Sequence, residues 1–133
     1  MDSARYGAAI APVNLPIHIV HGAAHRELHI DLSGAETVFV ATVILAGPLP
    51  AMVLLWTRWQ RPGLGLLAVT MAGSAAFGLY RHFAAMRPDH VGAQVAGVWG
   101  GTFASTACLL FLAEAASIYI GVRFLYRDGQ PMK

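Results

Sequence analysis

The stretch TVFVATVILAGPLPAMVLLW, at residues 37–56, contains no charged side chain. Two further uncharged runs follow at residues 64–80 and 91–113. After Glu114, the run at residues 91–113 continues as residues 115–122. A helix of about 20 apolar residues crosses the hydrocarbon core of a bilayer. None of the runs alternates apolar and polar residues as a barrel strand does. They therefore predict three transmembrane helices.

The composition indicates the same class of protein. Of 133 residues, 56% are hydrophobic and 12% are charged, about half of the charged share of roughly 25% in a soluble domain. A net charge of +2 is too small for a nucleic-acid-binding surface, and the single cysteine, Cys108, excludes an internal disulfide. We predict one all-α integral membrane domain over residues 1–133, with spans at about residues 36–57, 64–85 and 94–122.

A histidine-rich segment, LPIHIVHGAAHRELHIDL, precedes the first span at residues 15–32. Helical spacing places four imidazoles on an arc of about 80°. They are His18, His21, His25 and His29. The segment is too short and too charged to span, so it predicts an amphipathic helix on the membrane surface, within an extramembrane segment of residues 1–34. Ser33 and Glu36 have the spacing of a capping box at the start of the first span.

With three spans, the two ends of the chain lie on opposite sides of the membrane. All six histidines then fall on the N-terminal side, because His82 ends the second span and His90 follows it. The N-terminal side carries four basic residues (Arg5, Arg26, Arg81 and Arg87) and the other side five (Arg58, Arg61, Arg123, Arg127 and Lys133). The excess predicts an N-terminus outside and a C-terminus in the cytoplasm.

Imidazoles three or four residues apart on a helix can bind one metal ion together. One helix provides at most two such ligands, so a complete site needs residues from elsewhere on the same side of the membrane. The best candidates are His21, His25, His82 and His90. Further candidates are His18, His29, Asp89 and Glu36. Imidazole and carboxylate ligands suit copper or zinc. The alternatives are haem or chlorophyll bound through one imidazole, or a wet histidine surface that responds to pH.

The spans carry other features of interest. Glu114 is a carboxylate near mid-membrane, where an unpaired charge costs at least about 2.5 kcal/mol; it predicts either a proton or cation relay or a hydrogen-bonded group paired with Thr70, Ser74 or another chain. Pro48 and Pro50 predict a kink in the first span.

Small residues form stripes that favour close packing between helices, and one of the stripes is expected to meet another subunit. The residues concerned are Gly97, Gly100, Gly101, Ser74 and Gly78.

Three functions fit this pattern. The first is a small membrane protein that binds or delivers a transition metal ion at the outer face. The second is a non-catalytic accessory subunit of a respiratory, photosynthetic or oxygenase complex, with other membrane subunits or copies of itself as partners. The third is a metal-dependent membrane oxidoreductase. It is the weakest of the three, because the sequence offers no separate general base or nucleophile.

Overall fold

The structure is a computed structural model that describes residues 3–93 and 96–127. Within these residues it is helical and contains no strand. The helices are α1 (Ser3–Glu27), α2 (Gly34–Phe39), the π-helix η1 (Val40–Ala46), α3 (Pro48–Leu55), α4 (Gln60–Leu79), the π-helix η2 (Tyr80–Ala84) and α5 (Gly97–Arg127).

Three helical segments are long and apolar enough to cross a membrane. They are Gly34–Leu55, which joins α2, η1 and α3; Gln60–Ala84, which joins α4 and η2; and Gly97–Tyr126 within α5. The expectation of three helices of this kind is confirmed. Their mean hydropathies are 2.3, 1.5 and 1.7, and each is long enough to cover the hydrocarbon thickness of a bilayer.

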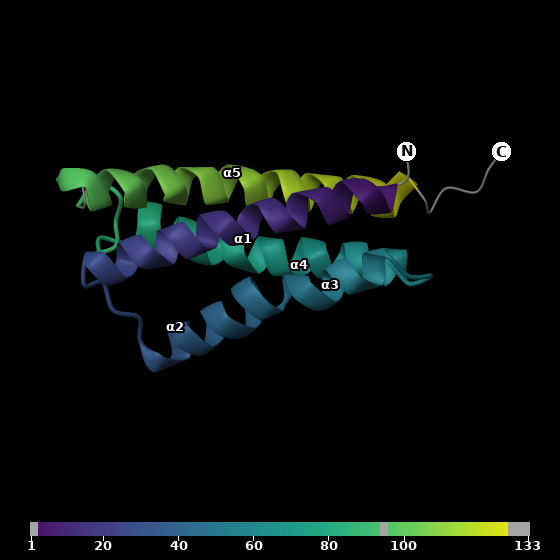
Figure 1. The fold of residues 1–133 in the computed structure, drawn as a ribbon, viewed down its shortest axis with the longest axis horizontal. Coiled ribbons are helices and arrows are strands. Elements are labelled where there is room, and N and C mark those ends of the chain that lie inside the picture. The colour runs from purple at the N-terminus through teal and green to yellow at the C-terminus, as the bar shows by residue number, and fades with distance from the viewer. Residues whose placement is uncertain (1–2, 94–95, 128–133) are drawn as a thin grey trace.

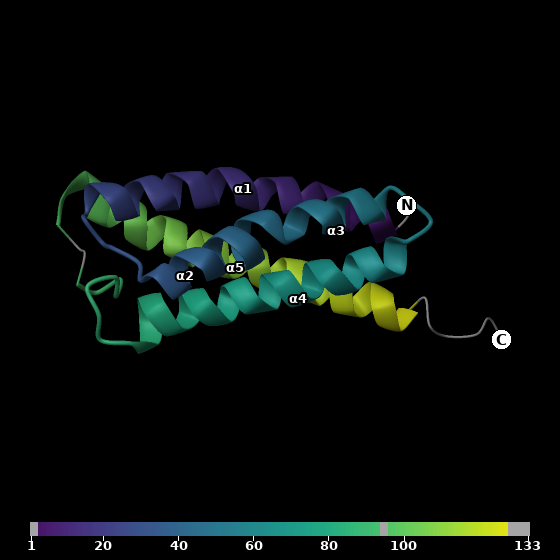
Figure 2. The same ribbon diagram turned by 90° about the horizontal axis from the view of Figure 1, so that it is seen from below.

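The N-terminal helix is not placed as the sequence predicts. Helix α1 is 25 residues long, contains Pro12 and Pro16 in its interior, and runs lengthwise beside α5 (Figures 1 and 2). The two helices are antiparallel, because Asn14 faces Ser117 while His21 faces Thr106. The sequence predicts a helix on the membrane surface, whereas the structure packs this helix lengthwise against α5; its place relative to a membrane stays a prediction. The polar face of α1 meets polar side chains of α4 and α5 instead of water.

The chain consequently runs up and down through a bundle of four rods. The start of α1, the end of α5 and the turn between α3 and α4 share one end, which we call the terminal end (Figure 1). The end of α1, η2 and the start of α5 share the other end, the histidine end (Figures 1 and 2). The expectation that the two ends of the chain lie at opposite faces is thus wrong for residues 3 and 127; Lys133 lies outside the described residues.

The first span changes its helical geometry next to its prolines, where the sequence predicts a kink. Ahead of Pro48 and Pro50 the helix widens into η1, and Gly47 joins η1 to α3. A proline removes one backbone donor and its ring crowds the preceding turn, so a wider helical turn relieves the clash. At Gly47 the helix also approaches α4 closely, since a Cβ there would lie 2.7 Å from Thr70 Cγ2.

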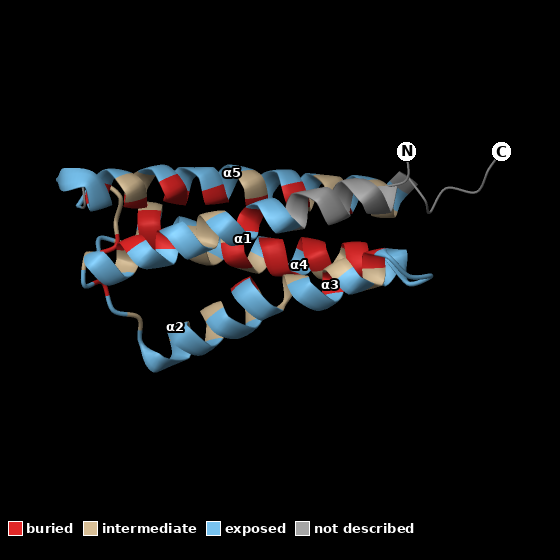
Figure 3. Ribbon diagram, in the orientation of Figure 1, coloured by how far each residue is buried: buried red, intermediate tan, exposed pale blue. Residues whose placement is uncertain are grey.

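Apolar side chains fill both ends of the bundle. At the terminal end Ala51, Leu55, Leu64, Leu67 and Met71 form a buried cluster. At the histidine end a smaller cluster consists of Ala24, Ile30 and Phe103. Figure 3 shows the buried residues on the faces that the rods turn toward one another, while much of α2 and the outer face of α5 is exposed.

The small-residue stripes divide between the inside and the outside of the bundle. Ser74 and Gly100 are buried. A Cβ built on Gly78 would lie 3.9 Å from Cδ2 of His82. Gly97 and Gly101 are exposed, and nothing lies within 4 Å of a Cβ built on either. The expectation that one of the stripes meets another subunit stays a prediction.

Candidate metal centre

Three of the predicted ligands come together at the histidine end. His21 and His25 lie one turn apart near the end of α1, and His82 reaches them from η2. One ring nitrogen of each lies within 4.8 Å of the others. His21 and His82 are buried and His25 is half-buried. These residues form a cluster that can hold a metal ion, and we call it the three-histidine cluster.

The benzyl ring of Phe103 supports this cluster from α5. Its centroid lies 4.9 Å from that of His21, in a stacked arrangement, and 5.0 and 5.1 Å from those of His25 and His82. The Phe103 side chain is fully buried. It fixes the three imidazoles from one side and keeps water away from that side of the cluster.

Hydrogen bonds determine which nitrogens carry protons. Nδ1 of His82 lies 2.9 Å from the Asp89 carbonyl oxygen, which can only accept, so Nδ1 donates. Nδ1 of His21 lies 2.8 Å from the Thr106 hydroxyl, which itself donates to the Thr102 carbonyl at 2.7 Å. The hydroxyl has one proton, so His21 Nδ1 donates to it. In the neutral rings, both Nε2 atoms are therefore unprotonated.

The two unprotonated Nε2 atoms face each other. They are 3.2 Å apart, and with no proton between them two lone pairs repel. A cation between the rings removes that repulsion. Two nitrogens bound to one tetrahedral zinc ion at its usual bond length are about 3.4 Å apart, so the observed spacing already matches that of two ligands on one ion.

His25 completes the cluster. Its Nδ1 is buried and has no hydrogen-bond partner among the described residues. A buried polar atom without a partner is rare in proteins and calls for an unplaced water or ion. A metal ion bound between the three rings supplies such a partner.

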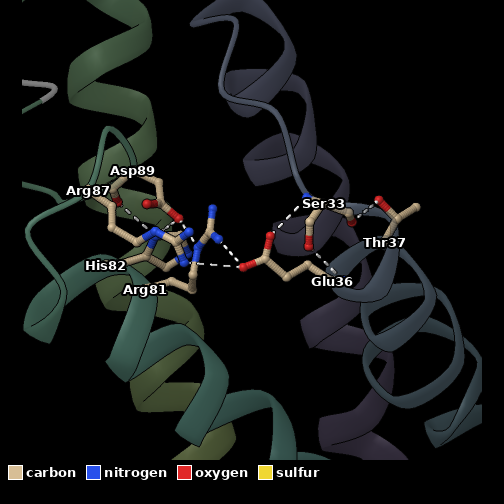
Figure 4. A network of polar contacts seen from close by, with 7 residues as sticks. All are labelled: Ser33, Glu36, Thr37, Arg81, His82, Arg87 and Asp89. Carbon is tan, nitrogen blue, oxygen red and sulfur yellow. Dashed lines mark hydrogen bonds and ion pairs between the residues drawn. The ribbon is translucent and has the colours of Figure 1, made fainter.

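A charged network behind the cluster orients His82 (Figure 4). Arg81 pairs with the fully buried Asp89 and also with Glu36. Asp89 Oδ2 lies 4.0 Å from His82 Nδ1, and the Asp89 carbonyl accepts from the same nitrogen. Histidine ligands in metal sites are commonly held in this way by a carbonyl or carboxylate on the far ring nitrogen. Asp89 thus positions His82 and does not belong to the cluster itself.

Glu36 has a structural role instead of a place in the cluster. Its carboxylate accepts from the Ser33 backbone N–H at 2.8 Å, and the Ser33 hydroxyl accepts from the Glu36 N–H at 3.3 Å, so the predicted capping box is confirmed. The same carboxylate pairs with Arg81 and lies 3.4 Å from Arg87 (Figure 4). Its oxygens are engaged by these donors, which tie α2 to η2.

Two further predicted ligands, His29 and His90, lie apart from the three-histidine cluster. His29 is exposed, follows the end of α1 and has a positive φ of 53°. Nδ1 of His90 accepts from the Gly92 N–H at 3.0 Å. Neither histidine belongs to the group of ligand atoms formed by His21, His25 and His82. The structure thus brings His21, His25 and His82 together and leaves His90 outside that group.

His18 lies one turn before His21 and meets Glu114. Its Nε2 is 3.6 Å from Glu114 Oε1, and that oxygen also accepts from the Ser74 hydroxyl. Ser74 is one of the partners predicted for this buried acid, and the pairing is confirmed. His18 Nε2 itself is buried without a hydrogen-bond partner in the part of the chain that the structure describes.

A cavity joins these two groups of residues. Its volume is about 800 Å³, and it is lined by the three-histidine cluster together with His18, Ser74 and Glu114. Ligand sites in proteins typically occupy 300–1,000 Å³. The cavity can thus hold an ion with several waters.

The sequence did not single out Thr106, Phe103 or Arg81 as parts of the site. The spacing of Phe103, Thr106, Leu110 and Glu114 follows one face of α5, so the buried acid marks the inner face that also carries the threonine. That signal is weak, because threonine and phenylalanine are common in apolar helices. The helical segment that carries Arg81, residues 60–84, contains no acidic residue. The acidic partners of Arg81 come from other segments.

Compared with known proteins, the chain matches no protein-family model, and neither a curated sequence nor a solved structure is significantly similar to it. Its function is therefore inferred from the geometry of the site.

Proposed function

We propose that the chain is an integral membrane protein that binds a divalent transition metal ion through His21, His25 and His82. The facing Nε2 atoms of His21 and His82, 3.2 Å apart and both unprotonated in the neutral rings, carry this proposal. Such an arrangement is unfavourable without a cation and suits two ligands of one ion. His25 adds the third donor, because one of its ring nitrogens lies within 4.8 Å of the ligand atoms of His21 and His82.

The outer surface of the bundle supports a membrane location. Large apolar side chains are more than half exposed on each of the three apolar rods, among them Val53 at 65%, Val69 at 70% and Leu112 at 64%. Soluble proteins rarely expose apolar surface so widely. Trp56 and Tyr126, near the terminal end, are exposed as interfacial aromatic anchors are.

The basic residues favour one orientation of the bundle. Because α1 runs inside the bundle, Arg5 moves to the terminal end. By the position of their backbone, five basic residues of the described chain then belong to the terminal end and three to the histidine end. The first group is Arg5, Arg58, Arg61, Arg123 and Arg127, and the second is Arg26, Arg81 and Arg87. We propose that the terminal end is cytoplasmic and that the metal site opens toward the outside.

Copper and zinc are the metals that the donor set favours. Three imidazoles bind zinc or copper well, and the described residues contribute no thiolate to the cluster. Three protein ligands also leave a fourth tetrahedral position for water or an incoming ligand. The short separation of His21 and His82 suits a single ion better than a haem between the two rings. A site of this kind binds an ion and still exchanges it.

Metal binding to the purified full-length protein in detergent tests the proposal. We expect one zinc or copper ion per chain and no haem absorption band. The variant His25→Ala removes a ligand whose Nδ1 bonds to no described residue, so the fold is expected to persist while the affinity for zinc falls at least about 100-fold, beyond the usual effect of disturbing a ligand's support.

The matched control is His90→Ala, which removes a histidine of the same end that lies apart from the cluster. It should bind zinc as tightly as the wild-type protein. Equal loss of zinc in His25→Ala and His90→Ala, or a wild-type protein that binds neither metal, would show that the three-histidine cluster is not a metal site.

A further inference from the structure

A row of polar side chains follows the inner face of α1. Asn14, His18, His21 and His25 are spaced four, three and four residues apart, so they stack along one side of the helix. They face polar side chains of α4, η2 and α5 at successive depths. Thr106 and His82 lie near the histidine end, Ser74 and Glu114 lie below them, and Ser117 lies deeper still. The row runs from the three-histidine cluster toward the terminal end.

Several atoms along this row lack partners. His25 Nδ1, His18 Nε2 and Asn14 Oδ1 are buried, and none of them bonds to a described residue. Unpaired polar atoms inside a bundle mark positions where water or an ion is expected. Three of them in succession on one helix, at three depths, indicate a continuous path instead of one isolated site.

The middle of the path has the donors of a second cation site. His18 Nε2 and Glu114 Oε1 are 3.6 Å apart, close to the spacing of about 3.4 Å for two ligands of one tetrahedral ion. The Ser74 hydroxyl lies on the same carboxylate oxygen. Imidazole and carboxylate are ligands that zinc accepts, and the Ser74 hydroxyl positions the carboxylate by donating to its Oε1.

The two sites are connected and lie at different depths. The same cavity of about 800 Å³ is lined by the three-histidine cluster and by His18, Ser74 and Glu114. Thr106, which holds His21, and Glu114 are eight residues apart on α5, which corresponds to about 12 Å along the helix axis. Along α1, His18 precedes His21 by three residues, about 4.5 Å. An ion that moves from the first site to the second therefore moves roughly 5–12 Å along the bundle axis.

The path is closed beyond the second site in this conformation. Asn14 donates toward Ser117 and Met71, and Met71 belongs to the apolar cluster of the terminal end. That cluster contains no polar side chain. The cavity is lined by exposed residues of the histidine end, among them Arg26, Glu27 and His29, while the side chains packed beyond Asn14 are apolar.

We propose that His18, Glu114 and Ser74 form a second cation site that receives the metal ion from the three-histidine cluster, so that the protein conducts a transition metal ion along the bundle axis. This inference rests on the proposed function of the first site. The row of unpartnered atoms and the shared cavity carry it, because a protein that only stored an ion at its outer end would need neither.

Zinc uptake by vesicles tests the proposal. The full-length protein is reconstituted into phosphatidylcholine vesicles that contain a fluorescent zinc indicator, and zinc is added outside. The wild-type protein should admit zinc faster than protein-free vesicles. Glu114→Gln keeps the size of the side chain and a partner for Ser74 but removes the anionic ligand, so uptake should fall at least about tenfold, as expected when a ligand is lost.

Zinc binding to the same variants separates the two sites. Glu114→Gln should retain the tight zinc site of the three-histidine cluster and lose any second bound ion. If Glu114→Gln also loses tight zinc binding, the uptake of zinc is measured with His18→Asn instead. That variant leaves Glu114 in place. The control Ser105→Ala changes a side chain on the exposed face of α5 and should take up zinc like the wild-type protein.

Two results would overturn the inference while leaving the first site intact. One is tight zinc binding by the wild-type protein with uptake no faster than in protein-free vesicles. The other is unchanged uptake by both Glu114→Gln and His18→Asn. If the wild-type protein does not bind zinc tightly, that result would instead contradict the proposed function of the three-histidine cluster.

Discussion

At the scale of single residues, Arg81 joins the site to the rest of the bundle. Its guanidinium contacts the carboxylates of Asp89 and Glu36, and its side chain is 4% exposed. Asp89 is fully buried and holds His82 through its backbone carbonyl. A buried carboxylate is tolerated only when it is paired. The orientation of a proposed metal ligand thus depends on an ion pair formed by the residue next to it.

Replacement of Arg81 is expected to unfold the histidine end. Arg81→Met leaves Asp89 buried without its cation, and breaking a buried pair from one side costs about 3–5 kcal/mol. The free energy of unfolding in mixed micelles, measured by titration with a denaturing detergent, should fall by this amount.

The matched control is Arg87→Met. Arg87 also contacts Glu36, at 3.4 Å, but its side chain is 45% exposed, and exposed pairs contribute about 1 kcal/mol or less. A loss of stability in Arg81→Met no larger than in Arg87→Met would contradict a structural role for the buried pair.

At the scale of the helices, two of the rods contain a π-helical segment in addition to their α-helices. The segment η1 precedes Pro48, and η2 carries Arg81 and His82. A wider turn rotates the residues after it around the helix axis, and such segments are frequent at functional sites. In η2 the wider turn buries two consecutive side chains, Arg81 and His82, which point to different partners.

Close contact between the rod of α2, η1 and α3 and the rod of α4 depends on Gly47. A Cβ at this position would lie 2.6 Å from the Val43 carbonyl oxygen and 2.7 Å from Thr70 Cγ2. Gly47→Ala must therefore push η1 and α3 away from α4, and overpacking of this kind costs about 1–3 kcal/mol. We expect a matching loss in the free energy of unfolding.

Gly65→Ala serves as the comparison within α4. Nothing lies within 4 Å of a Cβ built on Gly65, and alanine favours a helix over glycine by roughly 0.5–1 kcal/mol. This variant should be as stable as the wild-type protein or slightly more so. Equal stability of Gly47→Ala and Gly65→Ala would mean that the two rods are not in the contact described.

At the scale of the whole molecule, the position of α1 decides the number of rods and the place of the site. With α1 inside the bundle, the histidines line an internal cavity instead of a wet surface. Its lining residues come from all four rods, so neither the proposed metal site nor the proposed path exists without α1.

Labelling of single cysteines tests this arrangement. In a Cys108→Ser background, Ser3→Cys places a thiol at the terminal end and Met86→Cys places one at the histidine end, where Met86 is 93% exposed. A membrane-impermeant maleimide should label Met86→Cys on intact cells and Ser3→Cys only after the membrane is opened. Labelling of both positions from the same side would show that α1 does not cross the membrane with the other rods.

Much of the local structure could be predicted from the sequence. The apolar runs predict the three long helices, because the length of such a run is itself the physical requirement for crossing a bilayer. Ser33 and Glu36 predict the capping box, and Pro48 predicts the disturbed turn before it. Glu114 predicts a buried polar partner, because an isolated acid among apolar residues needs one.

Only the tertiary structure decided where the histidine face lies. Helical periodicity determines that His18, His21 and His25 share a face, but the same periodicity suits a face turned to water and a face turned to other polar side chains. The partners of this face, among them Thr106, Glu114 and His82, come from helices distant in sequence. Run length and periodicity are local properties of the chain, and they therefore predict the apolar helices and the shared histidine face. The burial of that face depends on packing, because its partners on η2 and α5 are distant in sequence and meet it only in the folded bundle.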